Sequence, residues 1–289
     1  MSSDIDGLLA KSNRFVAFLD VLGYKSVLSE PIQEDRRFRL LYSLCENLGV
    51  AVETALSDSI HAGAVDAVSF SDSYYFSGKD LSRLLHFLEH VFQNAYAFQS
   101  STYDREPDSW IPFIRAGVVE GWAVSFRDAT LTKLPRREVF RNPVGPAVAA
   151  AYQLTEKRGK LPGMRCFLES TLLDRCSPTK VAEPPHYRVT ADGWEMRLLD
   201  VPVSDLHKPD LRLVELAWPC RVIAADNCGF LDPIIKSREQ FSFGEEPDQQ
   251  RRDEHYNATI DLFRRSVDVC DDSHVRLMWN RLSGDLKRR

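Results

Sequence analysis

Two hydrophobic periods alternate along the first 120 residues, and their order is the strongest constraint on the fold. Short apolar runs typical of buried strands occupy residues 14–20, 65–70 and 74–76, and a further strand region, IPFIRAGVVEGWAVSF, covers residues 111–126. Residues 33–56 and 80–99 instead carry apolar side chains at three- and four-residue spacing, which predicts amphipathic helices. The resulting order, β-α-β-β-α-β, predicts an α/β (α+β) protein with a ferredoxin-like core and an antiparallel sheet. We expect the last of these strands to bend or break at Gly117 and Gly121.

The remaining patterns predict a second part of the chain. An alanine-rich helix is expected over residues 146–157 and a further strand over 164–170. Residues 185–224 hold two β-like runs, HYRVT…WEMRLLDV and LVELAWPCRVI, and a helix with an apolar stripe follows Glu245. We therefore predict a core domain at residues 1–180. A C-terminal β/helical extension at residues 181–289 would pack on that core or across a dimer.

Charge and composition argue against several classes of protein. The 37 basic and 42 acidic residues give a net charge of −5, and no block of five like charges offers a surface for duplex nucleic acid or an anionic membrane. No apolar run approaches the length of a membrane span, and the first residues do not resemble a signal peptide. None of the six cysteines forms a CxxC pair. These features predict a cytoplasmic protein with reduced thiols.

Two carboxylates follow apolar strands. Asp20 ends the run FVAFLD, and Asp72 lies in the turn SDS between the second and third strands. In a ferredoxin-like unit the end of the first strand lies beside the start of the third, so Asp20 and Asp72 should meet. Each alone is explained by ordinary turn chemistry, but a converging pair suits a hard divalent cation. The backbone carbonyl of Val21 is a third candidate ligand.

The turn after Asp20 has the character of a phosphate-binding segment. The sequence VLGYKS contains a glycine and leads toward a helix. Backbone N–H groups in such a turn can hold a triphosphate, and we assign this role to Leu22, Gly23 and Tyr24.

These segments resemble the motifs of class III nucleotidyl cyclases. FLDVLGY resembles the first-strand motif F-x-D-x-x-G-F/Y, and SFSDSYYFS is similar to the second metal motif. IRAGVVEG resembles R-x-G-x-x-x-G, and NPVGPAVAAAYQL resembles the following helix, G-x-x-V-N-x-A-x-R. The resemblance covers roughly residues 13–170. It implies that residues 1–180 form a cyclase catalytic domain, with Asp20, Val21 and Asp72 holding two divalent ions, Mn²⁺ or Mg²⁺.

The same resemblance implies a head-to-tail homodimer with active sites at its interface. One subunit would supply the metal aspartates, and the other would supply the helix that begins near Gly145.

The sequence departs from the purine cyclases of this family at four positions. The base-reading lysine and aspartate are replaced by Val68 and Asn142, and the helix asparagine and arginine by Ala149 and Gln153. Phosphoryl transfer depends on cationic stabilisation, so either another cation substitutes or the protein is inactive. The candidate substitutes are Arg115, Lys157 and Arg158.

This combination is similar to the pyrimidine cyclases of bacterial Pycsar anti-phage systems. It implies conversion of UTP or CTP to the 3′,5′-cyclic mononucleotide and pyrophosphate by two-metal catalysis, with a product that acts on a separate effector. Arg115 offers donors only, and uracil has two carbonyl acceptors, which favours UTP. A structural ion pair of Arg115 with Glu120 or another carboxylate explains the residue equally well. The alternatives are a cytidylate cyclase, a purine cyclase, and a catalytically dead nucleotide-binding dimer module.

Overall fold

The computed structural model describes residues 13–22, 24, 34–58, 63–70, 72–103, 113–123, 145–159, 161–206, 208, 210–225, 246–270 and 279. The strands are β1 Asn13–Leu22, β2 Val65–Phe70, β3 Ser73–Gly78, β4 Phe113–Trp122, β5 Arg165–Glu169, β6 Thr179–Val181, β7 His186–Ala191, β8 Trp194–Asp200 and β9 Leu213–Leu216. The α-helices are α3 Glu34–Ser57, α4 Leu81–Tyr103, α5 Pro146–Gln153, α6 Pro219–Ala225 and α8 Glu246–Val269. A π-helical turn η1 spans Leu154–Gly159, and 3-10 turns η2 and η3 span Ser170–Cys176 and Val203–Asp205.

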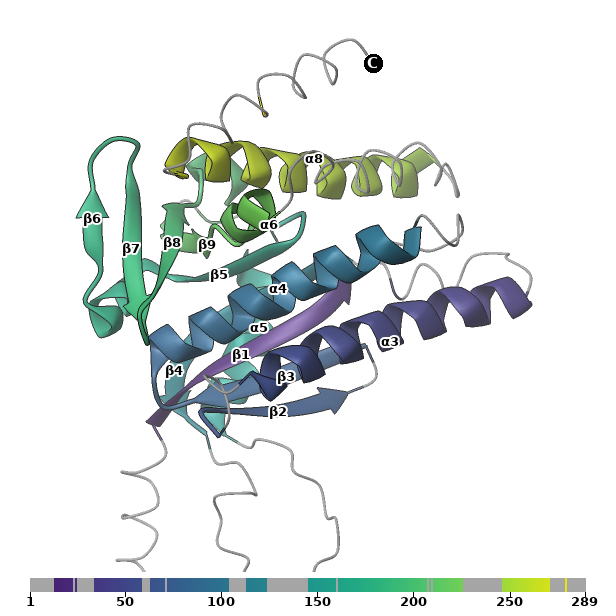
Figure 1. Ribbon diagram of the computed structural model, residues 1–289, viewed down its shortest axis with the longest axis horizontal. Coiled ribbons are helices and arrows are strands. Elements are labelled where there is room, and N and C mark those ends of the chain that lie inside the picture. The colour runs from purple at the N-terminus through teal and green to yellow at the C-terminus, as the bar shows by residue number, and fades with distance from the viewer. Residues whose placement is uncertain are drawn as a thin grey trace, which may run out of the picture.

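The predicted ferredoxin-like core is confirmed. Its four strands lie in the order β2-β3-β1-β4 within a nine-stranded sheet that continues as β5-β9-β8-β7-β6 (Figure 1). All neighbouring pairs are antiparallel except β4 and β5. The first and third strands of the core pair in the expected register, with Phe15 opposite Gly78 and Asp20 opposite Ser73.

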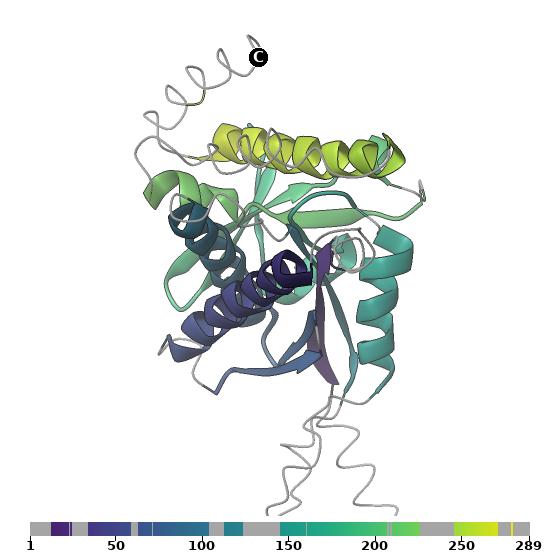
Figure 2. The ribbon, with the colours of Figure 1, turned by 90° about the vertical axis from the view of Figure 1, so that its right-hand side faces the viewer.

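Helices cover both faces of the core sheet. Figure 2 shows α3 and α4 on one side of β1 and α5 on the other. The amphipathic stripes of α3 and α4 join the main core, in which Leu48, Leu85 and Phe92 are buried. On the opposite face, Ala147 and Ala151 of α5 pack on Val16 and Phe18 of β1. This second layer is thin because α5 presents alanines to the sheet.

The expectation that β4 breaks at its glycines is wrong. Strand β4 keeps an unbroken register with β1, in which Gly117 lies opposite Phe18 and Gly121 opposite Arg14. A Cβ atom on Gly117 would lie 2.5 Å from Thr155 Oγ1, and one on Gly121 would lie 3.2 Å from Ala147 Cβ. The glycines therefore allow close approach of α5 and η1 to the strand.

The alanine-rich helix begins and ends differently from the expected helix over residues 146–157. It starts at Pro146, after Gly145 with φ 143°, where a Cβ would lie 2.5 Å from the Trp122 carbonyl oxygen. The α-helix ends at Gln153, and a π-helical turn replaces its predicted last turn. This change in winding alters which side chains face the sheet.

The C-terminal part shares the sheet of the core. Strand β9 pairs with β5, and β8, β7 and β6 extend the sheet beyond it. The second β-like run is a strand only at Leu213–Leu216, because Pro219 begins helix α6. The boundary at residue 180 stays a prediction, although the sheet is continuous across it.

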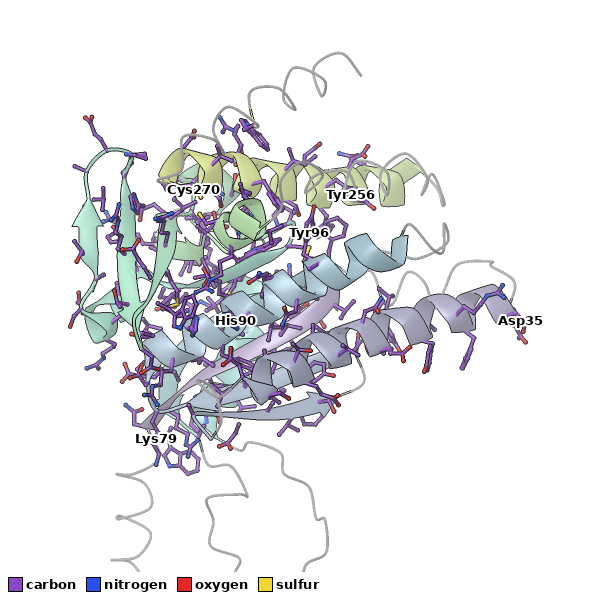
Figure 3. The ribbon with its side chains drawn as sticks, in the orientation of Figure 1. Asp35, Lys79, His90, Tyr96, Tyr256 and Cys270 are labelled. Carbon is purple, nitrogen blue, oxygen red and sulfur yellow. The ribbon has the colours of Figure 1, made fainter. Side chains whose placement is uncertain are left out.

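The apolar stripe predicted on the C-terminal helix packs against aromatic side chains of the rest of the protein. Phe263 of α8 lies 5.3 Å from Tyr96 of α4 and 5.4 Å from Trp218, measured between ring centroids. Figure 3 shows Tyr256 on α8 and Tyr96 between α4 and α8. Trp218 Nε1 donates to the Met164 carbonyl at 3.0 Å, so the indole is buried with its N–H paired. Helix α8 is thereby fixed over the end of the core.

In the part of the chain that the structure describes, no helix combines the length and apolar character needed to cross a membrane.

The close packing of α5 on β4 predicts the effect of adding one methyl group. Gly117→Ala should lower the free energy of unfolding by about 1–3 kcal/mol, because both the Thr155 hydroxyl and its backbone nitrogen at 3.3 Å resist displacement. Gly49→Ala is the matched control, since Gly49 lies inside α3, an added Cβ would meet only the Tyr74 hydroxyl at an ordinary contact distance of 3.7 Å, and alanine favours a helix. Chemical denaturation of both variants measures the effect. Equal stability of Gly117→Ala and the wild type would contradict the packing described here.

Candidate active site

The two predicted aspartates meet at the ends of β1 and β3. Asp20 pairs with Ser73, the residue that follows Asp72, and the Val21 N–H donates to the Asp72 carbonyl at 3.2 Å. Both aspartates are partly accessible to solvent. The antiparallel register thus brings together two carboxylates that are far apart in the sequence.

An arginine and a glutamate complete this cluster. Arg115 lies directly opposite Asp20 in the β1–β4 pair, and its side chain is buried. Its Nη2 donates to Glu156 Oε1 at 2.6 Å, and its Nη1 donates to the Leu161 carbonyl at 3.3 Å. Arg115 therefore forms the structural ion pair left open by the sequence, with Glu156 as its partner. Glu120 instead pairs with Arg175 at 3.0 Å.

The pKa of Asp20 shows how closely these acids gather. The pKa of Asp20 is raised from its ordinary value of 3.8 to about 7, mainly by burial and also by the nearby charges of Glu156 and Asp72. The Arg115 guanidinium opposes this shift, while a hydrogen bond between Asp20 and Glu156 adds to it. A proton shared within the cluster relieves the repulsion when no cation is bound.

Glu156 was not predicted as a site residue, and the π-helical turn explains why. Ala147, Ala151 and Thr155 face the sheet, and the Thr155 hydroxyl donates to the Ala151 carbonyl at 2.9 Å. In a regular α-helix, a residue five positions after Ala151 faces away from it. The i→i+5 winding of η1 instead brings that residue, Glu156, round toward the sheet. No period in the sequence signals this change.

The donor set is compatible with divalent metal ions. Asp20 and Asp72 supply carboxylate oxygens, the ligands that Mg²⁺ and Mn²⁺ prefer. After burial, the nearby charges of Glu156 and Asp72 contribute to the raised pKa of Asp20, and a cation would offset them. Within the described ranges, no group of three or more His, Cys, Asp or Glu side chains is placed to hold a metal ion. The assignment of Asp20, Asp72 and the Val21 carbonyl as metal ligands stays a prediction.

The predicted phosphate-binding segment lies beside this cluster. Leu22 ends β1 and is half-buried, and Tyr24 packs against the main core. Gly23 lies outside the described residues, as does Asn142, the residue predicted to replace the purine-reading aspartate.

The other predicted residues are not in contact with the aspartates of their own subunit. Val68 lies on β2 opposite Tyr75, on the same sheet face as Asp20 but two strands away. Ala149 and Gln153 are exposed on α5, and Lys157 is exposed on η1. Arg158 pairs with Glu169, the last residue of β5, at 3.0 Å. The site lies near the other end of β5, where Arg165 is opposite Arg115.

Aromatic side chains line the same sheet face next to α5. Phe18 lies 4.8 Å from Tyr75 and 5.3 Å from Tyr152 between ring centroids, and Phe70 lies 5.5 Å from Tyr75. Phe70 and Tyr152 are 37% and 41% exposed, which is high for large apolar rings. Phe70 and Tyr152 are thus the exposed part of this aromatic surface in the single chain, and Phe18 is its buried base.

The shifted pKa of Asp20 predicts a pH dependence of stability in the absence of divalent ions. Between pH 3.8 and about 7 the folded protein binds more protons at Asp20 than the unfolded chain does. The stabilising contribution of protonated Asp20 is therefore lost as the pH rises through about 7. Asp20→Asn should melt at least about 2–4 °C higher than the wild type at pH 8 in EDTA, and this difference should shrink at pH 5.

The control for this experiment is Asp210→Asn, which changes an exposed acid outside the cluster. Differential scanning calorimetry from pH 5 to 8 gives the comparison. Parallel melting curves for the wild type and Asp20→Asn at every pH would show that Asp20 is not under electrostatic repulsion.

Comparisons with known proteins yield remote structural similarities. No protein-family model and no curated protein matches the sequence. Among solved structures, the chain is similar to the guanylate cyclase domain of RhGC from Catenaria anguillulae in complex with GTP, at 12% identity and TM-score 0.44, over 71% of this chain and 96% of that one. It is also similar to the guanylyl cyclase Cya2, at 10% identity and TM-score 0.42, over 71% and 91% of the two chains. Adenylate cyclases from Trypanosoma brucei are similar at 9% identity and TM-score 0.42, over 71% and 88%. Likeness at this level is too distant to assign an activity to this chain.

Proposed function

We propose that the protein is a pyrimidine nucleotide cyclase that converts UTP to 3′,5′-cyclic UMP and pyrophosphate. The observation that carries this proposal is the convergence of Asp20 and Asp72 at the ends of β1 and β3, beside the Leu22–Tyr24 segment. The cyclase motifs in the sequence supply the reaction class, and the ferredoxin-like strand order is compatible with them.

The proposed reaction is an in-line displacement at the α-phosphate. The ribose 3′-oxygen forms a bond to the α-phosphorus, the bond to the bridging oxygen of pyrophosphate breaks, and the 3′-hydroxyl proton passes to solvent. Divalent ions, when bound, activate the attacking oxygen and offset the charge of the phosphates. Asp20 and Asp72 hold those ions, and the backbone of Leu22, Gly23 and Tyr24 binds the phosphates. Arg115 and Glu156 fix the position of Asp20.

The substrate base is inferred from two positions. Val68 places an apolar side chain on the face of the sheet that carries Asp20, where purine cyclases carry lysine. Arg115 keeps Nε as a donor without a hydrogen-bond partner among the described residues, since Nη1 and Nη2 are already bonded. A donor suits a carbonyl oxygen, and uracil has two, so UTP is favoured over CTP.

The exposed aromatic surface supports a homodimer with interfacial sites. Phe70 and Tyr152 expose rings that a second copy would cover. Exposed positions of α5 and η1, including Gln153 and Arg158, could then act on the partner's aspartates, since they do not reach their own. We further propose, from the resemblance to Pycsar cyclases, that the protein acts in the cytoplasm as signal generator for a separate anti-phage effector.

A catalytically dead nucleotide-binding dimer module is the second candidate. It is favoured by the raised pKa of Asp20, which keeps a proton in the acid cluster near pH 7, and by Ala149 and Gln153, which replace the catalytic asparagine and arginine. Release of pyrophosphate from any nucleoside triphosphate distinguishes the cyclase from this module.

The first test of function is product formation. The purified full chain, incubated with each of the four nucleoside triphosphates and Mn²⁺, should form cyclic UMP as the main product, identified by mass spectrometry. Cyclic CMP as the main product would move the assignment to a cytidylate cyclase. A dominant purine cyclic nucleotide would refute the pyrimidine assignment.

The second test concerns the metal ligands. Asp20→Ala and Asp72→Ala should each lower turnover by about 1,000-fold or more, because each removes an oxygen ligand from the charge-stabilising centre. Asp210→Ala, an exposed acid outside the site, is the control and should keep wild-type turnover. Substantial activity in either site variant would rule out the two-metal mechanism.

A further inference from the structure

A cavity of about 760 Å³ lies between the core and the C-terminal extension. Its floor includes Leu22, Arg115 and Arg165 at the ends of β1, β4 and β5, and η1 contributes Glu156. The opposite wall comes from η3 and from residues 254–261 of α8. The volume is in the range of small-molecule pockets. The extension therefore does more than cover the sheet, because it forms one wall of an open cavity next to the acid cluster.

Arg165 is the most informative residue of this cavity. Its side chain is 1% exposed, and its Nη2 donates to Asp205 Oδ2 at 2.9 Å, while its Nε lies 3.4 Å from Glu215 Oε2. Its Nη1 has no hydrogen-bond partner among the described residues, and neither does Arg115 Nε. Buried N–H groups without acceptors cost free energy. The floor of the cavity thus has unmet donor capacity, which a ligand oxygen would satisfy.

His255 adds a further donor to the α8 wall. The Gly163 N–H donates to His255 Nδ1 at 2.9 Å, so the proton of the neutral ring lies on Nε2. Burial, with the nearby charge of Arg115, lowers the pKa of His255 to about 4, so the ring stays neutral at physiological pH.

The charges around the cavity favour an uncharged ligand. Arg115 is paired with Glu156, Arg165 with Asp205, and Asp261 with Arg264 and Arg265. Glu254 and Asn257 are exposed at the rim and can accept hydrogen bonds. An oxyanion would meet these carboxylates without a surplus cation to balance it. The N–H groups of the floor require carbonyl oxygens on the ligand, and the acceptors of the rim require N–H groups on it. A ligand that carries both kinds of group matches the cavity.

We propose that this cavity binds a nucleobase, whose carbonyl oxygens face Arg165 and Arg115 and whose N–H edge faces the rim on α8. Nucleobases combine carbonyl and N–H groups on one flat ring, and a nucleoside fits the volume. Leu22 belongs both to the cavity and to the predicted phosphate-binding segment, so the two sites adjoin. The choice of uracil as the base rests on the proposed function. The need for a ligand with both carbonyl and N–H groups is inferred from the cavity alone. The base belongs either to the substrate or to a separate nucleoside effector.

The test uses uridine, which has no phosphates and so cannot bind through metal ions. Isothermal titration of the full chain in EDTA should show uridine binding. Ser204→Trp, which adds a ring at an exposed cavity position on η3, should weaken that binding at least tenfold. Val203→Trp is the matched control, because Val203 is exposed on the same turn but does not line the cavity. Wild-type affinity in Ser204→Trp, or no uridine binding to the wild type, would overturn the proposal.

Competition separates the two sources of the base. If the cavity receives the substrate base, a non-hydrolysable UTP analogue displaces uridine; if it receives an effector, both bind together. Either result supports the cavity as a nucleobase site. Asp20→Ala should keep uridine binding while losing turnover, so failure of the cyclase assignment leaves this test intact.

Discussion

The ion pair between Arg115 and Glu156 is the contact on which the candidate site depends. It joins the strand that faces Asp20 to the π-helical turn that follows α5, at 2.6 Å and largely out of solvent. Breaking one side would leave an unpaired charge in a poorly solvated place, which is strongly unfavourable. The pair therefore holds Glu156 near Asp20 despite the repulsion between their carboxylates. Burial, together with that repulsion, raises the proton affinity of Asp20, and on our proposal the repulsion also favours divalent cations.

Close packing makes this ion pair possible. Gly117 and Gly121 let α5 and η1 approach β4, and Thr155 bonds both its own helix and the Phe18 carbonyl at 3.3 Å. A larger residue at position 117 would displace the turn that carries Glu156. The α5 layer that carries these contacts is thin, and Phe70 of β2 and Tyr152 of α5 remain exposed on this face. The close packing of α5 and η1 is therefore found together with an exposed aromatic surface.

The C-terminal extension is integrated into this arrangement. Its strands continue the core sheet through β9, and α8 is tied to the segment before β5 by two hydrogen bonds. His255 accepts from the Gly163 N–H and Thr259 accepts from the Met164 N–H, each at 2.9 Å. Because α8 also forms a wall of the cavity over Arg115 and Arg165, movement of the extension would change access to the donors nearest Asp20. The extension and the candidate site therefore form one physical unit.

The sequence by itself determined the element order of the core and the meeting of Asp20 with Asp72. Buried strands and amphipathic helices leave local periodic patterns, and a β-α-β-β-α-β order admits few topologies. Only the tertiary structure decided that Glu156 joins the site, that Gly117 serves helix packing, and that β9 extends the core sheet. A π-helical turn, a close backbone approach and the pairing of distant strands depend on contacts between remote segments, and no local period records them. The meeting of Asp20 with Asp72 could therefore be predicted from the sequence, whereas the approach of Glu156 to Asp20 could not.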